Sequence, residues 1–592
     1  MRTLRLATAS LFCALFATAI SARAQVADHV LADHVPADAI AYAGWAGADS
    51  LGDPYNASHL KAFLDVLKLP QLISSQVQQG LAGQANAQQR ENAQLLQDLL
   101  TILAKSPTAV FMQPFDFPDN APPVPKVALI AKLPPGTFVN IPPLSALISQ
   151  NRGPNAPRVG IVKNGSYLEI FLGRPDIPDP NQPAPNGGLA ASPAFQKALQ
   201  HLSPNAAKSP ALAYIDAAAA LKTFTTAVDK SDNTQAQRLL APLVSLGLGG
   251  LTQIAFAGNF DGPDWRNTLF VGMTQKRDGF LFLLDSPNLP DAELRLIPKS
   301  ATTAASFRFD GVKLLQVLND VANAATNNGG QRIDQGLNQI WTFTGIDLKA
   351  DLFPALGDSF LMYASPDAAG NSIRGFTLIN RLRDAKKGQT AMNEITTFTN
   401  AALQQRNPNS PQFITQTLPD PWGSVTAHVI NLPQASPAWA IHDDILYFAL
   451  SIPALQDALD MTTGKKPSLL ENPQFLATRK RLADRPFSAF MFEDLAGSAP
   501  ETYQLVTRAL AQSQPLIANR IPTLPPLDQI TSALGPALSI TWTDADGYHL
   551  DAISPFLGAG YLNPFELIGL TLNQQTAAPA RGRFPAPGDA LP

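Results

Sequence analysis

Two short segments contain the residue types that a serine acyl-enzyme uses. Ser58-His-Leu-Lys61 places a lysine one helical turn after a serine, where its amine could take the hydroxyl proton. Ser231-Asp232-Asn233 would supply a second element of such a site. The third element, a Lys-Thr-Gly strand, is missing from the required place, because Lys163-Asn164-Gly165 lies upstream, in the wrong order. A helix that Ser58 caps, with Lys61 as a solvated side chain, explains the same residues, so both interpretations stay open.

The cysteine and histidine content argues against thiol and metal chemistry. The only cysteine, Cys13, lies in an apolar N-terminal segment, so the rest of the chain has no thiol for a disulfide, a nucleophile or a metal. The seven histidines form neither an H-x-x-x-H nor an H-E-x-x-H pair. Three aspartate pairs fit ordinary turns better than calcium loops: Asp116/Asp119, Asp176/Asp179 and Asp544/Asp546. We expect no cofactor and no bound metal.

The N-terminus has the three regions of an export signal in their required order. Arg2 and Arg5 precede an apolar segment, residues 6–20, that is too short to span a bilayer. Ala22-Arg23-Ala24 then gives the small-x-small pattern of a signal peptidase site. We expect residues 1–24 to be a signal peptide that is cleaved after Ala24, which would leave a cysteine-free mature chain in the periplasm or outside the cell.

Composition and charge narrow the classes of partner. The chain has 592 residues, of which 45% are apolar and 15% charged, and its formal net charge is −4. Cleavage of the predicted signal peptide, which carries arginines, makes the net charge of the chain more negative. A negative net charge gives no electrostatic attraction to nucleic acid. The most apolar later segment, residues 553–572, is interrupted by Pro555, Pro564 and Glu566, so we expect no transmembrane span. Residues 574–592 are rich in Ala and Pro and predict a disordered tail.

An internal duplication organises the remaining sequence. Residues 127–133 read like residues 376–382, and residues 110–112 read like residues 360–362, about 250 residues later in both cases. An apolar helix face at Leu60, Phe63, Leu64 and Leu67 recurs with the same spacing in residues 314–321. Collinear matches with slowly drifting separations are typical of two diverged copies that have gained and lost loop residues.

Turn and cap signals pair in the same order further along the chain. Asn164-Gly165 and Asp443-Asp444 each separate two apolar runs, and Asp261-Gly262 and Asp546-Gly547 do the same near the end of each copy. Ser192-Pro193 and Asn472-Pro473 both predict a helix start. We predict an α+β protein of two tandem homologous units, residues 28–290 and 291–560, built of mostly antiparallel sheet with helices covering one face.

The units resemble a family of exported bacterial proteins known only as a domain of unknown function. Three segments carry the resemblance: Pro36 to Tyr42, the Gly-Ile-Asp-Leu run from Gly345 to Gly357, and a hairpin with a short helix from Ala440 to Leu459. The resemblance covers most of the chain after residue 24, and the first copy departs from the Gly-Ile-Asp pattern at Gln94 to Lys105. It implies no catalytic or ligand-binding residue.

We therefore expect an exported, non-catalytic scaffold or binding protein of the bacterial cell envelope. Two other hypotheses remain: a serine acyl-enzyme of the penicillin-binding type that uses Ser58 and Lys61, and a periplasmic carrier of an apolar ligand. A glutamine- and alanine-rich helical arm, Gln76 to Gln97, has no counterpart of similar composition in the second copy. We predict that this arm binds an envelope protein partner, whereas the sequence gives no indication of oligomeric state.

Overall fold

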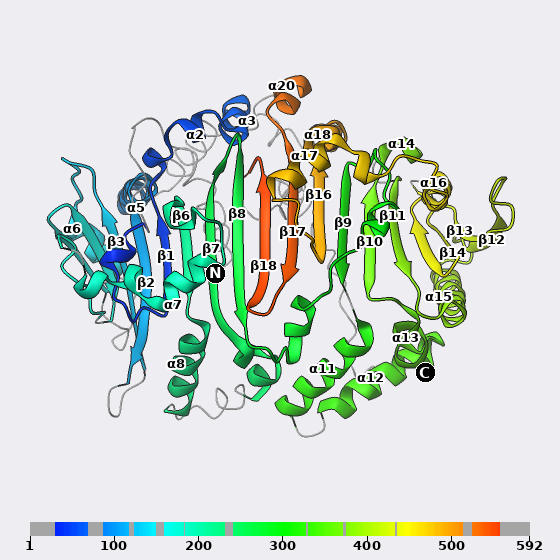
Figure 1. Cartoon of the computed structure of the whole chain (residues 1–592), viewed down its shortest axis with the longest axis horizontal. Coiled ribbons are helices and arrows are strands. Elements are labelled where there is room, and N and C mark those ends of the chain that lie inside the picture. Colours follow the sequence, from blue (N-terminus) through cyan, green and yellow to red (C-terminus); the bar gives the residue numbers. More distant parts are fainter. Residues whose placement is uncertain are drawn as a thin grey trace.

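The computed structural model describes most of the chain and brings its two halves side by side in one sheet (Figure 1). The described residues are 30–68, 87–117, 123–149, 159–173, 175–182, 184–230, 241–308, 310–326, 329–370, 374–432, 435–512 and 524–556. They form a single 18-stranded sheet in which every strand pair is antiparallel. The α+β class and the antiparallel pairing predicted from the sequence are thus confirmed.

The strands of the first half are neighbours in the order β4-β5-β3-β2-β1-β6-β7-β8. Tight turns explain the pairs β4–β5 and β7–β8, because consecutive strands joined by a turn pair with each other, whereas β1–β6 and β3–β5 pair strands that are not consecutive. Their bounds are β1 Ala41–Trp45, β2 Thr108–Asp116, β3 Val124–Lys132, β4 Val159–Asn164, β5 Tyr167–Leu172, β6 Ala211–Ile215, β7 Leu251–Asp261 and β8 Asp264–Met273.

The second half follows the same order from the other end of the sheet, β14-β15-β11-β10-β9-β16-β17-β18, with the hairpin β12–β13 added beyond β14. β8 pairs with β18, so the two sets meet in the middle of the sheet (Figure 1). The bounds are β9 Thr303–Arg308, β10 Ser359–Ala364, β11 Phe376–Arg381, β12 Phe413–Thr417, β13 Thr426–Ile430, β14 Ala438–His442, β15 Ile445–Ala449, β16 Ala489–Asp494, β17 Pro536–Thr543 and β18 Gly547–Ser554.

The turns and helix starts that the sequence predicted lie where expected. Asn164 ends β4 and Gly165 begins the turn to β5, and Asp443-Asp444 forms the turn from β14 to β15. Gly165, Asp443 and Asp444 all have positive φ angles, as the tight turns of hairpins require. The helices α7 and α17 both begin with proline at their first position, after Ser192 and Asn472 respectively.

The helices gather mainly at the two ends of the strands, with α2, α3, α18 and α20 at one end and α8, α11 and α12 at the other (Figure 1). The bounds of the longer helices are α2 Gly52–Asn56, α3 His59–Leu67, α5 Ala87–Lys105, α6 Ile141–Ser149, α7 Pro193–Gln200, α8 Ala217–Asp229, α11 Gly311–Ala325, α12 Gly329–Thr344, α15 Ala385–Arg406, α16 Ile452–Thr462, α17 Pro473–Arg481, α18 Leu495–Gln512 and α20 Leu527–Ser532.

Two large apolar clusters lie on one side of the sheet, which we call the core face. In the first half, α7 packs there through Phe195 against Tyr42 and Tyr214. In the second half, α16 and α17 pack there against strands that include β11 and β16. The prediction that helices cover one face is incomplete, because α5 and α6 pack on the opposite face of β3, β4 and β5. The alternation of side chains along these strands explains how both faces become apolar.

Several sequence predictions fall outside the described residues. These are the signal peptide (1–24), Ser231-Asp232-Asn233, the tail (574–592) and the first half of the arm (76–86). The second half of the arm lies in α5, where Leu99 is buried and Leu95 packs against the same cluster. In the described part of the chain, no helix is long and apolar enough to cross a bilayer.

Candidate functional site

Ser58 and Lys61 make contacts that are typical of a helix start. The Ser58 hydroxyl donates a hydrogen bond to the Tyr55 carbonyl oxygen at 2.6 Å and accepts one from the Lys61 backbone N–H at 3.1 Å. The Lys61 ammonium forms an ion pair with Asp65, one turn further along α3. In this geometry the amine of Lys61 is bound to a carboxylate, and the serine serves as the N-cap. The acyl-enzyme hypothesis stays a prediction, which a fluorescent β-lactam tests directly.

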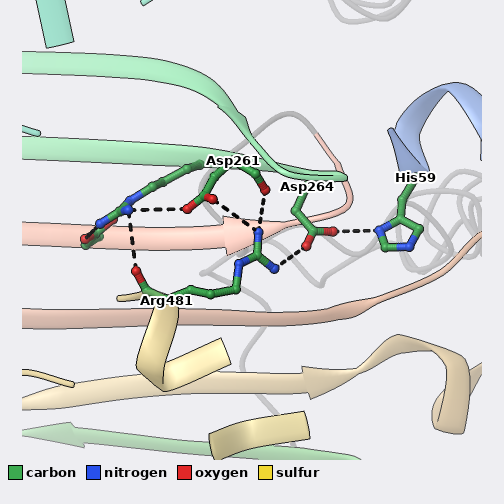
Figure 2. Close-up of polar contacts among 6 residues, drawn as sticks. His59, Asp261, Asp264 and Arg481 are labelled. Carbon is green, nitrogen blue, oxygen red and sulfur yellow. Dashed lines mark hydrogen bonds and ion pairs between the residues drawn. The ribbon is translucent and has the colours of Figure 1, made fainter. Parts of the chain in front are cut away.

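A network of charged side chains joins three distant segments beside these residues (Figure 2). The carboxylate of Asp264, at the start of β8, lies 2.7 Å from His59 Nδ1 and 2.5 Å from Arg481 Nη1. His59 is the first residue of α3, and Arg481 is the last residue of α17. Arg481 also donates a hydrogen bond to the backbone carbonyl of Asp261. The turn between β7 and β8 is thereby fastened to a helix from each half of the chain.

The environment of Asp264 keeps it ionised. Burial alone would raise its pKa, since the side chain is only 2% exposed, but the hydrogen bonds from His59 and Arg481 outweigh burial and lower the pKa below its usual value. Gly535 allows His59 to approach, because a Cβ atom on Gly535 would lie 2.9 Å from the imidazole Cε1. A carboxylate that holds one imidazole nitrogen fixes the tautomer, which is useful in catalysis as well as in structure.

A second ion pair continues the network across the middle of the sheet. Arg266 on β8 binds both carboxylate oxygens of Asp551 on β18, through Nε at 2.9 Å and Nη2 at 2.6 Å. Arg266 Nη1 also reaches Asp261 at 3.3 Å. The side chain of Asp551 is only 5% exposed, so its end of this bidentate ion pair is shielded from water. The described contacts of this network therefore join protein groups to one another. They stabilise the junction of the two halves.

An aromatic row crosses the same junction on the core face. His549 on β18 stacks on Trp542 of β17, with ring centroids 4.8 Å apart, and contacts Phe270 of β8 at 4.9 Å. His201, which follows α7, stacks on Phe270 at 4.1 Å. His549 Nε2 lies 3.0 Å from the Asp544 carboxylate. Burial lowers the pKa of His549 below its usual value, and the carboxylate of Asp544 opposes this effect.

A pocket of about 360 Å³ opens on the other side of the sheet, which we call the second face. It lies over β9, β16 and β17, at the end of the short helix η7 (Gly279–Leu284). Its volume falls in the range of roughly 300–1,000 Å³ that ligand pockets occupy. Its lining is mostly apolar and consists of Leu283, Leu284, Ser286, Ala305, Ser306, Phe307, Arg308, Met362, Ser488, Ala489, Phe490, Met491, Ser539, Thr541 and Tyr548.

The pocket lies where the central strands lack a hydrophobic core. Phe307, Met362 and Met491 belong to none of the apolar clusters of the described residues, and Phe307 is 40% exposed. Phe307 stacks on Phe360, the neighbouring ring of β10, with centroids 5.0 Å apart. Exposed apolar side chains beside a cavity are typical of a binding site. We regard this pocket as the candidate functional site.

Asp119, one of the aspartates that the sequence analysis compared with calcium ligands, lies outside the described residues, and the others lie in turns and ion pairs. Asp116 and Asp176 both pair with Lys126, at 2.9 and 3.4 Å. Asp544 accepts hydrogen bonds from the backbone N–H groups of Asp546 and Gly547, which is an ordinary turn. The described residues contain no group of three or more His, Cys, Asp or Glu side chains that could hold a metal ion.

Sequence reasoning missed both the network and the pocket. Asp264 and Arg481 lie more than 200 residues apart, and the pocket draws on η7 and five strands. The alternation of side chains is ordinary in both β17, at Ser539 and Thr541, and β16, at Ala489 and Met491. Only the strand order reveals that these two pairs of residues are neighbours. The one usable signal was the alternation of side chains along each hairpin strand, which indicates the residues on its exposed face.

The sequence model of a family described as "Protein of unknown function (DUF3352)" matches residues 268–538. The match runs from β8 into β17 and includes the pocket-forming strands β9, β10 and β16. It is in line with the resemblance to a domain of unknown function, and it covers less than half of the chain. No curated protein and no solved structure matches the chain.

Proposed function

We propose that this protein is a non-catalytic binding protein of the bacterial cell envelope that holds an apolar ligand in the pocket of the second face. The observation that carries the proposal is the position of that pocket. Both large apolar clusters of the sheet lie on the core face, while Phe307, Met362 and Met491 line a cavity on the side that those clusters leave uncovered. This proposal joins the leading hypothesis, a binding protein, with the alternative of an apolar-ligand carrier.

The architecture supports a binding role over a catalytic one. The polar groups around His59 and Asp264 are bound to one another and lie on β8 and α3, whereas the pocket is formed by β9, β16 and β17. We further propose that the two halves arose by duplication, because eight strands of each half are neighbours in the same order. Two ancestral sheets joined at β8 and β18 would give a long rigid surface for a ligand.

An apolar fluorescent probe tests the binding proposal. N-phenyl-1-naphthylamine gains fluorescence in an apolar site, so the full chain is expected to bind it saturably. Met491→Trp fills the pocket and should weaken probe binding about tenfold, equivalent to about 1.4 kcal/mol. The matched control is Leu505→Trp on α18, where the side chain is already 53% exposed and is not among the lining residues. Unchanged binding in Met491→Trp would refute the pocket as the site.

We also propose that the chain is exported and cleaved after Ala24, on the grounds of its N-terminal sequence. Intact-mass measurement of protein from the periplasm and the medium would give a mature chain that begins at Gln25. Retention of residues 1–24 in the cytoplasm would contradict export.

The arm is the proposed contact for an envelope protein partner. Only its second half, in α5, is described, and its side chains at Glu91, Gln94, Leu96 and Asp98 are exposed. Deleting residues 76–86, which spares the packed Leu95 and Leu99, should remove a cross-linked partner from envelope preparations. An unchanged set of partners would refute this contact.

A further inference from the structure

The pocket lies where two neighbouring strands part. The described pairing of β9 with β16 ends at Ser306 and Phe490, and beyond that point Phe307 and Arg308 of β9 line the pocket. Side chains alternate along a strand, so Ser306 and Arg308 project from one side of β9. Ala305 and Phe307 project from the other side, and all four residues line the same pocket. The pocket therefore has a polar and an apolar part.

Arg308 has a hydrogen-bonding edge that the described residues leave unused. Its Nη1 donates a hydrogen bond to Asp358 Oδ1 at 3.0 Å. Its Nε is buried without a hydrogen-bond partner among the described residues, and none of them accepts a hydrogen bond from its Nη2. Nε and Nη2 form the side of a guanidinium that can bind both oxygens of one carboxylate. Because a buried N–H group without an acceptor is unfavourable, a ligand oxygen at this edge would be stabilising.

Ser306 provides a second donor on the same side of β9. The residue is 5% exposed, and its Oγ accepts a hydrogen bond from the backbone N–H of Phe490 at 3.2 Å. A hydroxyl can also donate one hydrogen bond, and no group of the described residues accepts it. The Ser306 hydroxyl can therefore donate to a ligand oxygen.

The charges at the pocket favour an anionic headgroup. Arg308 is the only charged side chain among the described residues of the lining. The Arg308 side chain is 13% exposed, whereas that of Asp358 is 44% exposed, so water screens the aspartate more than the guanidinium. A carboxylate at the free edge of Arg308 would form a charge-assisted pair there, whereas a cationic headgroup would meet a like charge.

An apolar row lines the other side of β9. Met491 of β16 lies opposite Ala305 of β9, and Ala305 lies opposite Met362 of β10. Residues opposite each other in an antiparallel pair point to the same side of the sheet, so these three side chains form one row of the pocket wall. Methionine side chains are unbranched and adapt their shape, which suits a flexible hydrocarbon chain.

We propose that the pocket takes a single-chain amphiphile with a carboxylate headgroup, as in a fatty acid. The carboxylate binds the Nε–Nη2 edge of Arg308 and accepts a hydrogen bond from Ser306, and the hydrocarbon chain lies along the row of Met491, Ala305 and Met362. This inference rests on the proposed function, because it names the ligand class of the same pocket.

Competition among three ligands of equal chain length tests the headgroup. Laurate, monolaurin and dodecyltrimethylammonium differ in headgroup charge, and each is used below its micelle concentration to displace N-phenyl-1-naphthylamine from the full chain. Laurate is expected to bind about tenfold more tightly than monolaurin and more tightly still than the cation, because only laurate forms a charge-assisted pair with Arg308. Equal or tighter binding of monolaurin or of the cation would overturn the proposal.

Variants of the ion pair test the contact with Arg308. Arg308→Gln removes the guanidinium and is expected to weaken laurate binding about tenfold, while the affinities for monolaurin and the dye are unchanged. Asp358→Asn is the matched control, because it breaks the same ion pair but keeps the guanidinium, so laurate should bind at least as tightly as it binds wild type. Equal losses in the two variants would show that the ion pair acts through the fold and would overturn the contact.

A charge-preserving variant keeps the test decisive if Arg308→Gln does not fold. Arg308→Lys retains the positive charge but lacks the Nε–Nη2 edge, so laurate should bind about threefold more weakly than to wild type, with monolaurin affinity unchanged. The same affinity for laurate as in wild type would overturn the assignment of this edge.

The outcomes separate the two proposals. If the variants leave laurate affinity unchanged while the dye still binds saturably, the headgroup assignment fails and the apolar pocket stands. A wild-type chain that binds neither the dye nor any of the three amphiphiles refutes the pocket altogether, and the ligand class with it.

Discussion

Asp264 is the residue at which the two halves of the chain and the central hairpin meet. Its carboxylate is buried, and it accepts hydrogen bonds from His59 of α3 and Arg481 of α17. Removing one member of a buried ion pair leaves its partners without compensation. Asp264 therefore contributes to stability through both neighbours, although they are themselves about 27% and 30% exposed.

We predict that Asp264→Asn lowers the free energy of unfolding by about 3 kcal/mol. The folded pKa of Asp264 lies below its unfolded value, so this stabilisation is present above the unfolded pKa and is lost as the pH falls through the folded pKa. Urea unfolding at pH 7 and at several values below pH 5 measures both effects. Asp65→Asn, an exposed acid on α3, is the control and should cost about 0.5 kcal/mol. Equal losses in the two variants would contradict a special role for Asp264.

At the residue scale, the sequence could predict Ser58 as a helix cap, because the cap signal is local. Asp264 and Arg481 carried no such signal, since their types and neighbours are those of any turn and any helix end. Their partnership depends on strand order, which no local pattern specifies.

The hairpins show the clearest agreement between sequence and structure. The two-residue turns are Gly165-Ser166 in the first half and Asp443-Asp444 in the second, and φ is positive at Gly165 (+58°), Asp443 (+47°) and Asp444 (+59°). Aspartate tolerates this backbone region less well than glycine does. The second turn thus places two non-glycine residues in this region, whereas the first places only a glycine there.

We predict that Asp444→Gly raises the free energy of unfolding by about 0.5–1 kcal/mol, whereas Gly165→Ala lowers it by about 1 kcal/mol or more. In Gly165→Ala, the new Cβ atom would also lie 2.4 Å from Asn181 Oδ1. Thermal and urea unfolding of both variants measures the difference. A stabilised Gly165→Ala protein would show that the turn adopts another conformation.

The elements that sequence analysis described incompletely are those held by distant contacts. The arm, Gln76 to Gln97, was predicted as a helix with few apolar positions, and in its described part Leu95 of α5 packs against the cluster formed with α6 and β3 to β5. Its apolar positions are few, so the packing face could not be recognised from periodicity alone. The extra hairpin β12–β13 has no counterpart among the described residues of the first half, and so no comparison between those residues and the second half could indicate it.

At the scale of the whole molecule, the pairing of β8 with β18 turns two sets of strands into one sheet. His549 lies at this junction, 5% exposed, between Trp542 and Phe270. The charged groups that face it are Asp544, which binds its Nε2, His201 across the junction, and Arg485, which lies over Trp542. Protonation of both histidines would place two like charges at ring centroids 6.1 Å apart.

We predict that the protein loses stability as the pH falls from 7.5 to 5. The folded pKa of His549 is lowered, so the unfolded chain binds this proton more readily and stability rises with pH in that range. His549→Phe keeps the aromatic row and should reduce the loss. His442→Phe, at a side chain that is 28% exposed, should leave it unchanged. Equal pH dependence in all three proteins, measured by urea unfolding, would contradict the assignment.

The β8–β18 pairing has a consequence for shorter relatives. A chain that contained only one of the two strand sets would expose the backbone N–H and C=O groups of its innermost strand along a full edge. Two identical chains would satisfy those groups by aligning their edges in opposite directions, as β8 and β18 do. Single-set proteins of this architecture are therefore expected to assemble as twofold-symmetric homodimers.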